Sequence, residues 1–357
     1  MENLVTPALD ARGTRILVTG HTGFKGAWLC EWLLKAGAEV SGIALEPEYP
    51  DAMFNVLGLS QRLASHAICD IRDGDALAAA VKRADPQIIF HMAAQALVRR
   101  SYREPLLTWQ TNVDGTLNLL EGARALGRPV TVVAVTTDKV YRNNEWEYAY
   151  REDDALGGRD PYSASKAACE LAVSSWRASF GKPDGVTVVT ARAGNVIGGG
   201  DVCEDRIVPD CFRAWSKGET VLMRNPRATR PWQHVLEPLS GYIALAAQAH
   251  GGTPAILECN FGPNDEGSCT VETLVKAFAA LNPARRWDVT AAPPEHEARA
   301  LALCIDRARH KLGWAPRLAF QETVAWTDAG YSTTDLPSVV RQQIAEFETK
   351  ASPAFAG

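Results

Sequence analysis

The chain carries Val18-Thr19-Gly20-His21-Thr22-Gly23-Phe24-Lys25-Gly26, three glycines at three-residue spacing directly after a short β-branched run. Between a strand and a helix, the first glycine permits a tight turn and the second lets the backbone approach a pyrophosphate. The third allows the helix to pack closely. The N-terminus of the helix then supplies N–H donors for the phosphates. The alternative is a glycine-rich connection without a ligand, but strand, spacing and helix together favour a dinucleotide site. Its candidate contacts are Gly20, Thr22, Gly23, Phe24, Lys25 and Gly26.

A βαβ pattern surrounds this motif, with strands expected at 16–19 and 39–44 and a helix near 26–36. The alternation continues with strands at 88–91, 131–136 and 187–192 and helices around 108–125 and 162–180. The strands are nearly continuous apolar runs, as expected when helices cover both faces of a sheet. The sequence therefore predicts an α/β fold with a Rossmann-like, doubly wound parallel sheet.

The regular alternation ends at the glycine-rich segment 194–200, after which prolines become frequent. We expect a dinucleotide-binding domain at 1–194 and a smaller C-terminal substrate-binding lobe at 195–357. The segment 235–249 reads as a helix that returns to pack on the first domain.

Composition narrows the class of protein. With 46% hydrophobic and 22% charged residues and a net charge of −5, the 357 residues have globular composition and no basic field for nucleic acid. The apolar runs have strand length, so no membrane helix is expected, and the start lacks a secretory pattern, which predicts a cytoplasmic protein. The eight cysteines lack zinc or disulfide spacing and are expected to be reduced thiols, with no metal site.

Residues that follow the later strands indicate which dinucleotide binds, NAD or NADP. Glu46 lies 20 residues beyond Gly26, where a carboxylate can bind a ribose 2′-hydroxyl and repel a 2′-phosphate, which favours NAD over NADP. Leu45 at that position, with Glu46 as a solvated loop acid, is the alternative. Further candidate contacts are Asp70, Ile71, Ala93, Ala94 and Gln95; the small side chains at 93 and 94 also fit plain core packing.

A catalytic set is indicated by Tyr162 and Lys166, four residues apart and hence on one helix face, and by the run Thr137-Asp138-Lys139 after a strand. An ammonium beside a phenol lowers the phenol's pKa toward use as a base. The strand end and the helix start meet at the edge where open α/β sheets bind ligands. The alternatives are a surface Tyr and Lys and an ordinary charged pair.

These residues resemble the nucleotide-sugar 4,6-dehydratases of the extended short-chain dehydrogenase/reductase superfamily, over about 15–330. The resemblance rests on the glycine motif and on His91-Met92-Ala93-Ala94-Gln95, Val98-Arg99-Arg100-Ser101-Tyr102, Thr136-Thr137-Asp138-Lys139, Gly157-Gly158, Asp160-Pro161-Tyr162, Arg192-Ala193-Gly194-Asn195-Val196-Ile197-Gly198-Gly199-Gly200-Asp201 and Arg230-Pro231-Trp232-Gln233-His234-Val235-Leu236-Glu237-Pro238. In having Lys139, the chain resembles the branch that acts on CDP-glucose. The branch that acts on dTDP-glucose carries an acidic residue at this position.

The resemblance implies NAD as cofactor and a CDP-sugar as substrate. Tyr162, with Lys166 and Thr137, would remove the C4 hydroxyl proton as hydride leaves C4; Lys139 would take the C5 proton and Asp138 would protonate the departing C6 hydroxyl. The implied cofactor set adds Asn112, Tyr162 and Lys166. The candidate substrate contacts are Gln95, Asn195, Arg206, Arg224, Arg230 and His234.

Two other functions stay open. A 4-epimerase, or a 4,6-dehydratase acting on another nucleotide sugar, would share the fold, although Asp138 argues against the epimerase. A non-catalytic dinucleotide sensor would have little use for Thr137, Tyr162 and Lys166 together. The resemblance also implies a homodimer or homotetramer, paired through the helices around 108–125 and 162–180.

Overall fold

The computed structural model describes residues 9–181, 183–223, 225–264, 268–290 and 300–350. A sheet of seven parallel strands forms its centre, in the order β3-β2-β1-β4-β5-β6-β11. The strands are β1 Arg15–Thr19, β2 Glu39–Ala44, β3 Ser65–Ile68, β4 Ile88–His91, β5 Val130–Val135, β6 Val186–Ala193 and β11 Glu258–Phe261. The order reverses between β1 and β4, so the predicted doubly wound fold is confirmed.

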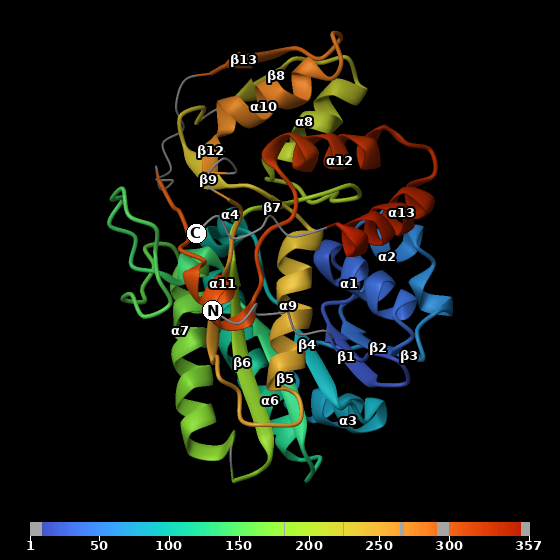
Figure 1. The fold of residues 1–357 in the computed structure, drawn as a ribbon, viewed down its shortest axis with the longest axis vertical. Helices are drawn as coiled ribbons and strands as arrows, with labels where there is room; N and C mark the ends of the chain where they lie inside the picture. The colour runs from blue at the N-terminus through green and yellow to red at the C-terminus, as the bar shows by residue number, and fades with distance from the viewer. Residues whose placement is uncertain (1–8, 182, 224, 265–267, 291–299, 351–357) are drawn as a thin grey trace.

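Helices cover both faces of this sheet (Figure 1). Alternate strand residues such as Ile16 and Phe90 pack with α1 (Phe24–Lys35) and α9 (Leu236–Ala249). Their neighbours Leu17 and Ile89 pack on the other side with α3 (Gly74–Ala84), α6 (Gly115–Arg124) and α7 (Pro161–Trp176). Two separate apolar layers explain why the strands read as continuous hydrophobic runs.

A smaller lobe lies beyond the carboxyl ends of the strands, at the top of Figure 1. Its core joins Val208, Trp232, Phe278 and Val324. The lobe contains α8 Ile207–Ser216, β8 Val221–Met223, β9 Thr229–Pro231, β12 Ser268–Thr270, α10 Val271–Ala280, β13 Trp287–Val289 and α12 Phe320–Ser332. The remaining elements are α2 Met53–Val56, α4 Val98–Arg103, α5 Pro105–Trp109, β7 Val196–Ile197, β10 Gln233–His234, α11 Asp306–Leu312 and α13 Leu336–Thr349.

The helix expected around 108–125 differs in detail from the prediction. It consists of α5, a π-helical turn η2 at Gln110–Asp114, and α6. The helix expected at 162–180 is α7 followed by a second π-helical turn at Arg177–Gly181. Hydrophobic periodicity detects both helices but not the π-helical turn between α5 and α6 or the one at the end of α7.

The division of the chain near residue 194 stays a prediction. Beyond that point, β11 pairs in parallel with β6, and α9 packs on β5 and β6. The later part of the chain therefore contributes to the sheet and its cover as well as to the lobe.

None of the described helices is long and apolar enough to cross a membrane. All eight cysteines are free thiols. Within the described ranges, no three metal-ligating side chains of the His, Cys, Asp and Glu types gather at one point.

Candidate active site

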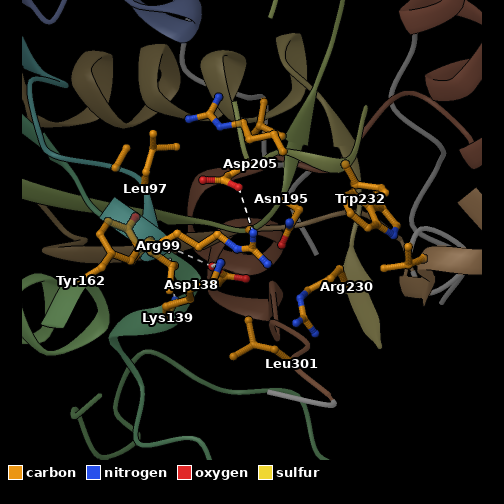
Figure 2. Close-up of a pocket in the computed structure, with 18 of the residues that line it drawn as sticks. Leu97, Arg99, Asp138, Lys139, Tyr162, Asn195, Asp205, Arg230, Trp232 and Leu301 are labelled. Carbon is orange, nitrogen blue, oxygen red and sulfur yellow. Dashed lines mark hydrogen bonds and ion pairs between the residues drawn. The ribbon is translucent and has the colours of Figure 1, made fainter. Parts of the chain in front are cut away.

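A cavity of about 990 Å³ lies between the sheet and the smaller lobe. Figure 2 shows Asp138, Lys139 and Tyr162 projecting into it together with Arg99, Asn195 and Arg230. The residues predicted from sequence that line it are Phe24, Lys25, Thr137, Asp138, Lys139, Tyr162, Asn195, Arg206 and Arg230. These residues are far apart in the sequence. Several of them meet there because the strands of a parallel sheet end at the same edge.

The glycine turn forms a cradle at the start of α1. Gly20 has a φ of +74°, and a Cβ on it would lie 2.8 Å from the backbone N of Ala93. A Cβ on Gly26 would lie only 2.2 Å from the Gly20 carbonyl oxygen. Gly23, the N-cap of α1, meets no atom closer than 3.4 Å, and no side chain caps the helix. The first N–H groups of α1 thus face an open surface that fits a pyrophosphate.

The strand ends beside this cradle carry the remaining dinucleotide candidates. Thr22 donates a hydrogen bond to the Leu45 carbonyl at 3.0 Å, which fixes the turn, and Glu46 follows as an exposed acid. Asp70 is held by Arg72 at 3.0 Å, and the side-chain hydrogen bond from Arg72 lowers the pKa of Asp70. Ile71 is buried, and Ala93 and Ala94 are half-buried. Their contacts with NAD stay predictions.

Gln95 and Asn112 make hydrogen bonds to other protein groups and do not line the cavity. Asn112 accepts from the Gln95 backbone N at 2.9 Å and donates to Ser165 Oγ at 2.9 Å. The Gln95 amide is bound to Leu97 and Thr108. Both side chains join the segment after β4 to the π-helical turn and α7. Their contacts with ligands stay predictions.

Asp138 and Lys139 lie in a short 3₁₀ turn, η3 (Asp138–Val140), which follows β5 and has Thr137 as its N-cap. The Thr137 hydroxyl donates to Asp138 Oδ1 at 2.9 Å. Asp138 is only 1% exposed, and its Oδ2 has no partner among the described residues. Lys139 Nζ lies 3.8 Å from Asp138 Oδ1. A buried carboxylate oxygen without a partner is costly unless a ligand contacts it.

Tyr162 is the second residue of α7, which Asp160 caps by accepting from the Ser163 backbone N at 2.9 Å. Burial raises the pKa of Tyr162 to about 12, while a hydrogen bond with Thr137 acts in the opposite direction. Lys166 donates to the Val135 carbonyl at 3.3 Å, and burial lowers its own pKa. Burial thus raises the pKa of Tyr162 overall. The lowering of that pKa by Lys166 stays a prediction.

A buried ion pair, Arg192 with Glu170, joins α7 to β6. Glu170, one turn after Lys166, accepts from Arg192 at 2.9 and 3.0 Å and from Thr136 and Thr190. Burial acts to raise the pKa of Glu170, but hydrogen bonds and charge from Arg192 outweigh it and hold that pKa below its ordinary value. Sequence reasoning missed Glu170, although Arg192 belongs to one of the resembling blocks. Its i+4 spacing from Lys166 was the available signal.

The substrate candidates have different environments. Asn195 Oδ1 is buried without a partner among the described residues, and Arg206 pairs with the buried Asp201 at 2.8 Å. Arg230 donates to the Thr229 carbonyl at 2.9 Å. Arg224 lies outside the described residues.

His234 does not line the cavity. It is fully buried, with its ring 5.7 Å from Trp28 and 5.6 Å from Trp326 in edge-on contacts. Burial lowers its pKa to about 3. In this structure His234 is a neutral packing residue between α1 and α12.

Arg99 is a cavity residue to which the sequence reasoning gave no role. It comes from α4 and pairs with Asp205 at 3.1 Å, the contact dashed in Figure 2. Asp205, in the loop before α8, has a φ of +59°, unusual for a residue with a side chain. The pair joins the sheet side of the cavity to the lobe side. Only the resembling block around Arg99 pointed to this segment.

Comparisons with known proteins agree with this geometry. The chain is 43% identical over 347 residues to the CDP-glucose 4,6-dehydratase of Salmonella typhimurium, covering 94% of this chain and 96% of that protein. Among solved structures, the epimerase Mth375 of Methanothermobacter thermautotrophicus shares the fold, with a TM-score of 0.78 at 23% identity, covering 93% and 95% of the two chains. MoeE5 in complex with UDP-glucose and NAD has a TM-score of 0.74 at 25% identity, covering 88% and 97%.

A protein-family model also matches most of the chain. This model, described as GDP-mannose 4,6 dehydratase, matches residues 17–327 and so includes both the glycine cradle and the cavity. Together with the 43% identical relative, this match shows that the chain belongs to the GDP-mannose 4,6 dehydratase family of extended short-chain dehydrogenases/reductases.

Proposed function

We propose that this chain is a CDP-glucose 4,6-dehydratase, which converts CDP-glucose to CDP-4-dehydro-6-deoxyglucose and water. The observation that carries the proposal is that Thr137, Asp138, Lys139 and Tyr162 line one cavity in a chain 43% identical to a protein of that name. Elimination across C5 and C6 of a hexose requires an acid beside an amine. Simple oxidation does not require this pair.

NAD is the cofactor that fits the cradle. The uncapped N-terminus of α1 and the open face of Gly23 support a pyrophosphate, and the exposed Glu46 supports a ribose without a 2′-phosphate. NAD, when bound, accepts hydride from C4 of the sugar and returns it to C6, so the reaction has no net redox change. Tyr162 lines the cavity and Lys166 follows it by one turn of α7, so these two residues would serve the reacting end of such a cofactor.

The proton transfers fall to this chain's own residues. Tyr162 takes the C4 hydroxyl proton, and Thr137 supports its ionised form by hydrogen bonding. Once C4 is a ketone, the C5 proton is acidic and Lys139 removes it. Asp138 then donates a proton to the departing C6 hydroxyl. The 3.8 Å between Lys139 Nζ and Asp138 Oδ1 suits two groups that serve adjacent carbon atoms.

The substrate's diphosphate and sugar are held from the lobe side. Arg230 presents a planar guanidinium that matches phosphate oxygens, and the buried Asn195 Oδ1 still needs a hydrogen-bond donor. Sugar hydroxyls can supply that donor. The preference for a cytosine base rests on the identity with the Salmonella protein.

The protein pairs with copies of itself, as a homodimer or homotetramer, through the α5–α6 and α7 surface. Leu106 on α5 is 76% exposed and Leu171 on α7 is 61% exposed, and α5 packs against α7. Trp109, also on α5, is a further exposed aromatic side chain. Exposed apolar side chains on two adjacent helices are typical of a contact between subunits.

The direct test is to incubate the protein with CDP-glucose and NAD and to follow the 4-keto product by its alkaline absorbance. dTDP-, UDP- and GDP-glucose are run in parallel. Product from CDP-glucose alone is expected. Product from another nucleotide sugar would change the base assignment, and epimerised sugar without loss of water would replace the dehydratase by a 4-epimerase.

A further inference from the structure

The amine of Lys25 lies in the cavity without an anionic partner among the described residues. Lys25 is the second residue of α1, and its side chain, half-buried, lines the cavity with Asp138 and Tyr162. Its Nζ lies 5.8 Å from the centre of the Tyr242 ring on α9. No hydrogen bond or ion pair joins it to any residue that the structure describes. The glycine motif predicted a cofactor contact for Lys25 without a role for its side chain.

The charged groups that act on this amine come from three other elements. They are Arg206 before α8, Lys166 on α7 and Asp138 in η3. Arg206 is already paired with Asp201 at 2.8 Å, and one oxygen of Asp138 is taken by Thr137. Two cations and one shared acid leave the surroundings of Lys25 short of negative charge.

We propose that the Lys25 amine binds a phosphate oxygen of the ligands that enter this cavity, an inference that rests on the proposed function. A buried ammonium without a counter-charge is unfavourable, and a phosphate removes that cost with a charge-assisted hydrogen bond. Helical side chains lean toward the helix N-terminus, so Lys25 leans toward the open cradle of Gly23. The amine therefore lies between the cradle and the catalytic residues. Phosphates reach this place from two sources, the dinucleotide and the nucleotide sugar.

The titration of Lys25 supports this assignment. Burial, with the charges of Arg206 and Lys166, lowers the pKa of Lys25 to about 7. A phosphate beside the amine raises that pKa again. At pH 8 the free amine is mostly neutral, so binding of the phosphate ligand takes up a proton.

The test is calorimetric titration of the full-length protein with NAD, and then of the NAD-saturated protein with CDP. Lys25→Met should weaken one of these two ligands about tenfold or more, and Lys25→Arg should restore most of that loss. The ligand that is weakened identifies the source of the phosphate. At pH 8, titrations in buffers of different ionisation enthalpy should show proton uptake for the wild type and less for Lys25→Met.

Lys35→Met, at the other end of α1 and paired with Glu348 at the surface, is the control and should bind both ligands normally. Lys25→Gln replaces Lys25→Met if circular dichroism shows that the latter is unfolded. Normal binding of both ligands by the Lys25 variants, with unchanged proton uptake, would refute the role of Lys25 alone. A wild type that binds neither ligand would refute the proposed function itself.

Discussion

Thr137 connects the acid and the phenol of the site. Its hydroxyl donates to Asp138 at 2.9 Å, accepts from the Lys139 backbone N at 3.3 Å and is hydrogen-bonded with Tyr162. One hydroxyl thereby orients the two groups to which the proposed mechanism assigns the protons at C4 and C6. The arrangement leaves Asp138 Oδ2 for the substrate.

The role of Lys139 can be tested separately from binding. Lys139→Met should lower kcat by about 10²–10⁴ because the C5 proton loses its acceptor, while affinity for NAD and CDP stays normal. The measurement is incorporation of solvent deuterium at C5 alongside turnover. Lys276→Met, on an exposed face of α10, is the control. Full turnover by Lys139→Met would remove Lys139 from the mechanism.

Single side chains show where sequence reasoning works and where it stops. Asp138, Lys139 and Tyr162 were predictable, because a strand end and a helix start bring them to a known edge of the sheet. His234 and Arg99 were not, since their positions depend on packing between distant elements. His234 lies between indole rings from α1 and α12, and Arg99 pairs across the cavity. The raised pKa of Tyr162 was not predicted from sequence, because it is caused by burial in the folded protein.

At the scale of elements, the Arg192–Glu170 pair fixes α7 to β6. Arg192→Met leaves the Glu170 charge buried without its partner and should lower the free energy of unfolding by about 3–5 kcal/mol. Urea unfolding followed by circular dichroism measures this loss. Arg103→Met breaks an exposed pair with Glu204 and should cost less than about 1 kcal/mol. Equal losses in the two variants would contradict the importance of the buried pair.

Glu237 makes the start of α9 sensitive to pH. Its Oε1 accepts from the backbone N atoms of Arg317 and Leu318, while Oε2 has no partner among the described residues. Burial raises the pKa of Glu237 from 4.5 to about 8. A raised folded-state pKa means that the folded protein binds the extra proton, so its stabilisation is complete below pH 4.5 and is lost as pH rises through 8.

Glu237→Gln keeps the Oε1 acceptor and removes the titration. Relative to this variant, the wild type should lose up to about 1.4 kcal/mol per pH unit within that window. Urea midpoints measured across it for both proteins provide the comparison. Parallel curves would show that Glu237 is ionised throughout.

The elements themselves were largely predictable from hydrophobic periodicity. The strands at 16–19, 39–44 and 88–91 and both faces of the sheet follow from it. The π-helical turn η2 does not, because it depends on Asn112 reaching Gln95 and Ser165. A local pattern cannot encode contacts with residues 17 and 53 positions away.

At the scale of the whole molecule, the exposed apolar surface of α5 and α7 predicts association. Leu171→Glu should dissociate the oligomer by placing a charge in the contact, as measured by analytical ultracentrifugation. Leu222→Glu is the matched control, since Leu222 on β8 is also 61% exposed but belongs to the smaller lobe. Dissociation by Leu222→Glu instead would place the contact on the lobe.

The position of β11 also governs how the protein is made. β6 gains its outer partner only when residues 258–261 arrive, long after the strands at 15–193 have been synthesised. Until then a nascent chain on the ribosome exposes a row of unpaired backbone groups along β6, an open template for pairing with other chains. Productive folding is therefore completed late in translation, and the interval before β11 emerges is when a chaperone has most to protect.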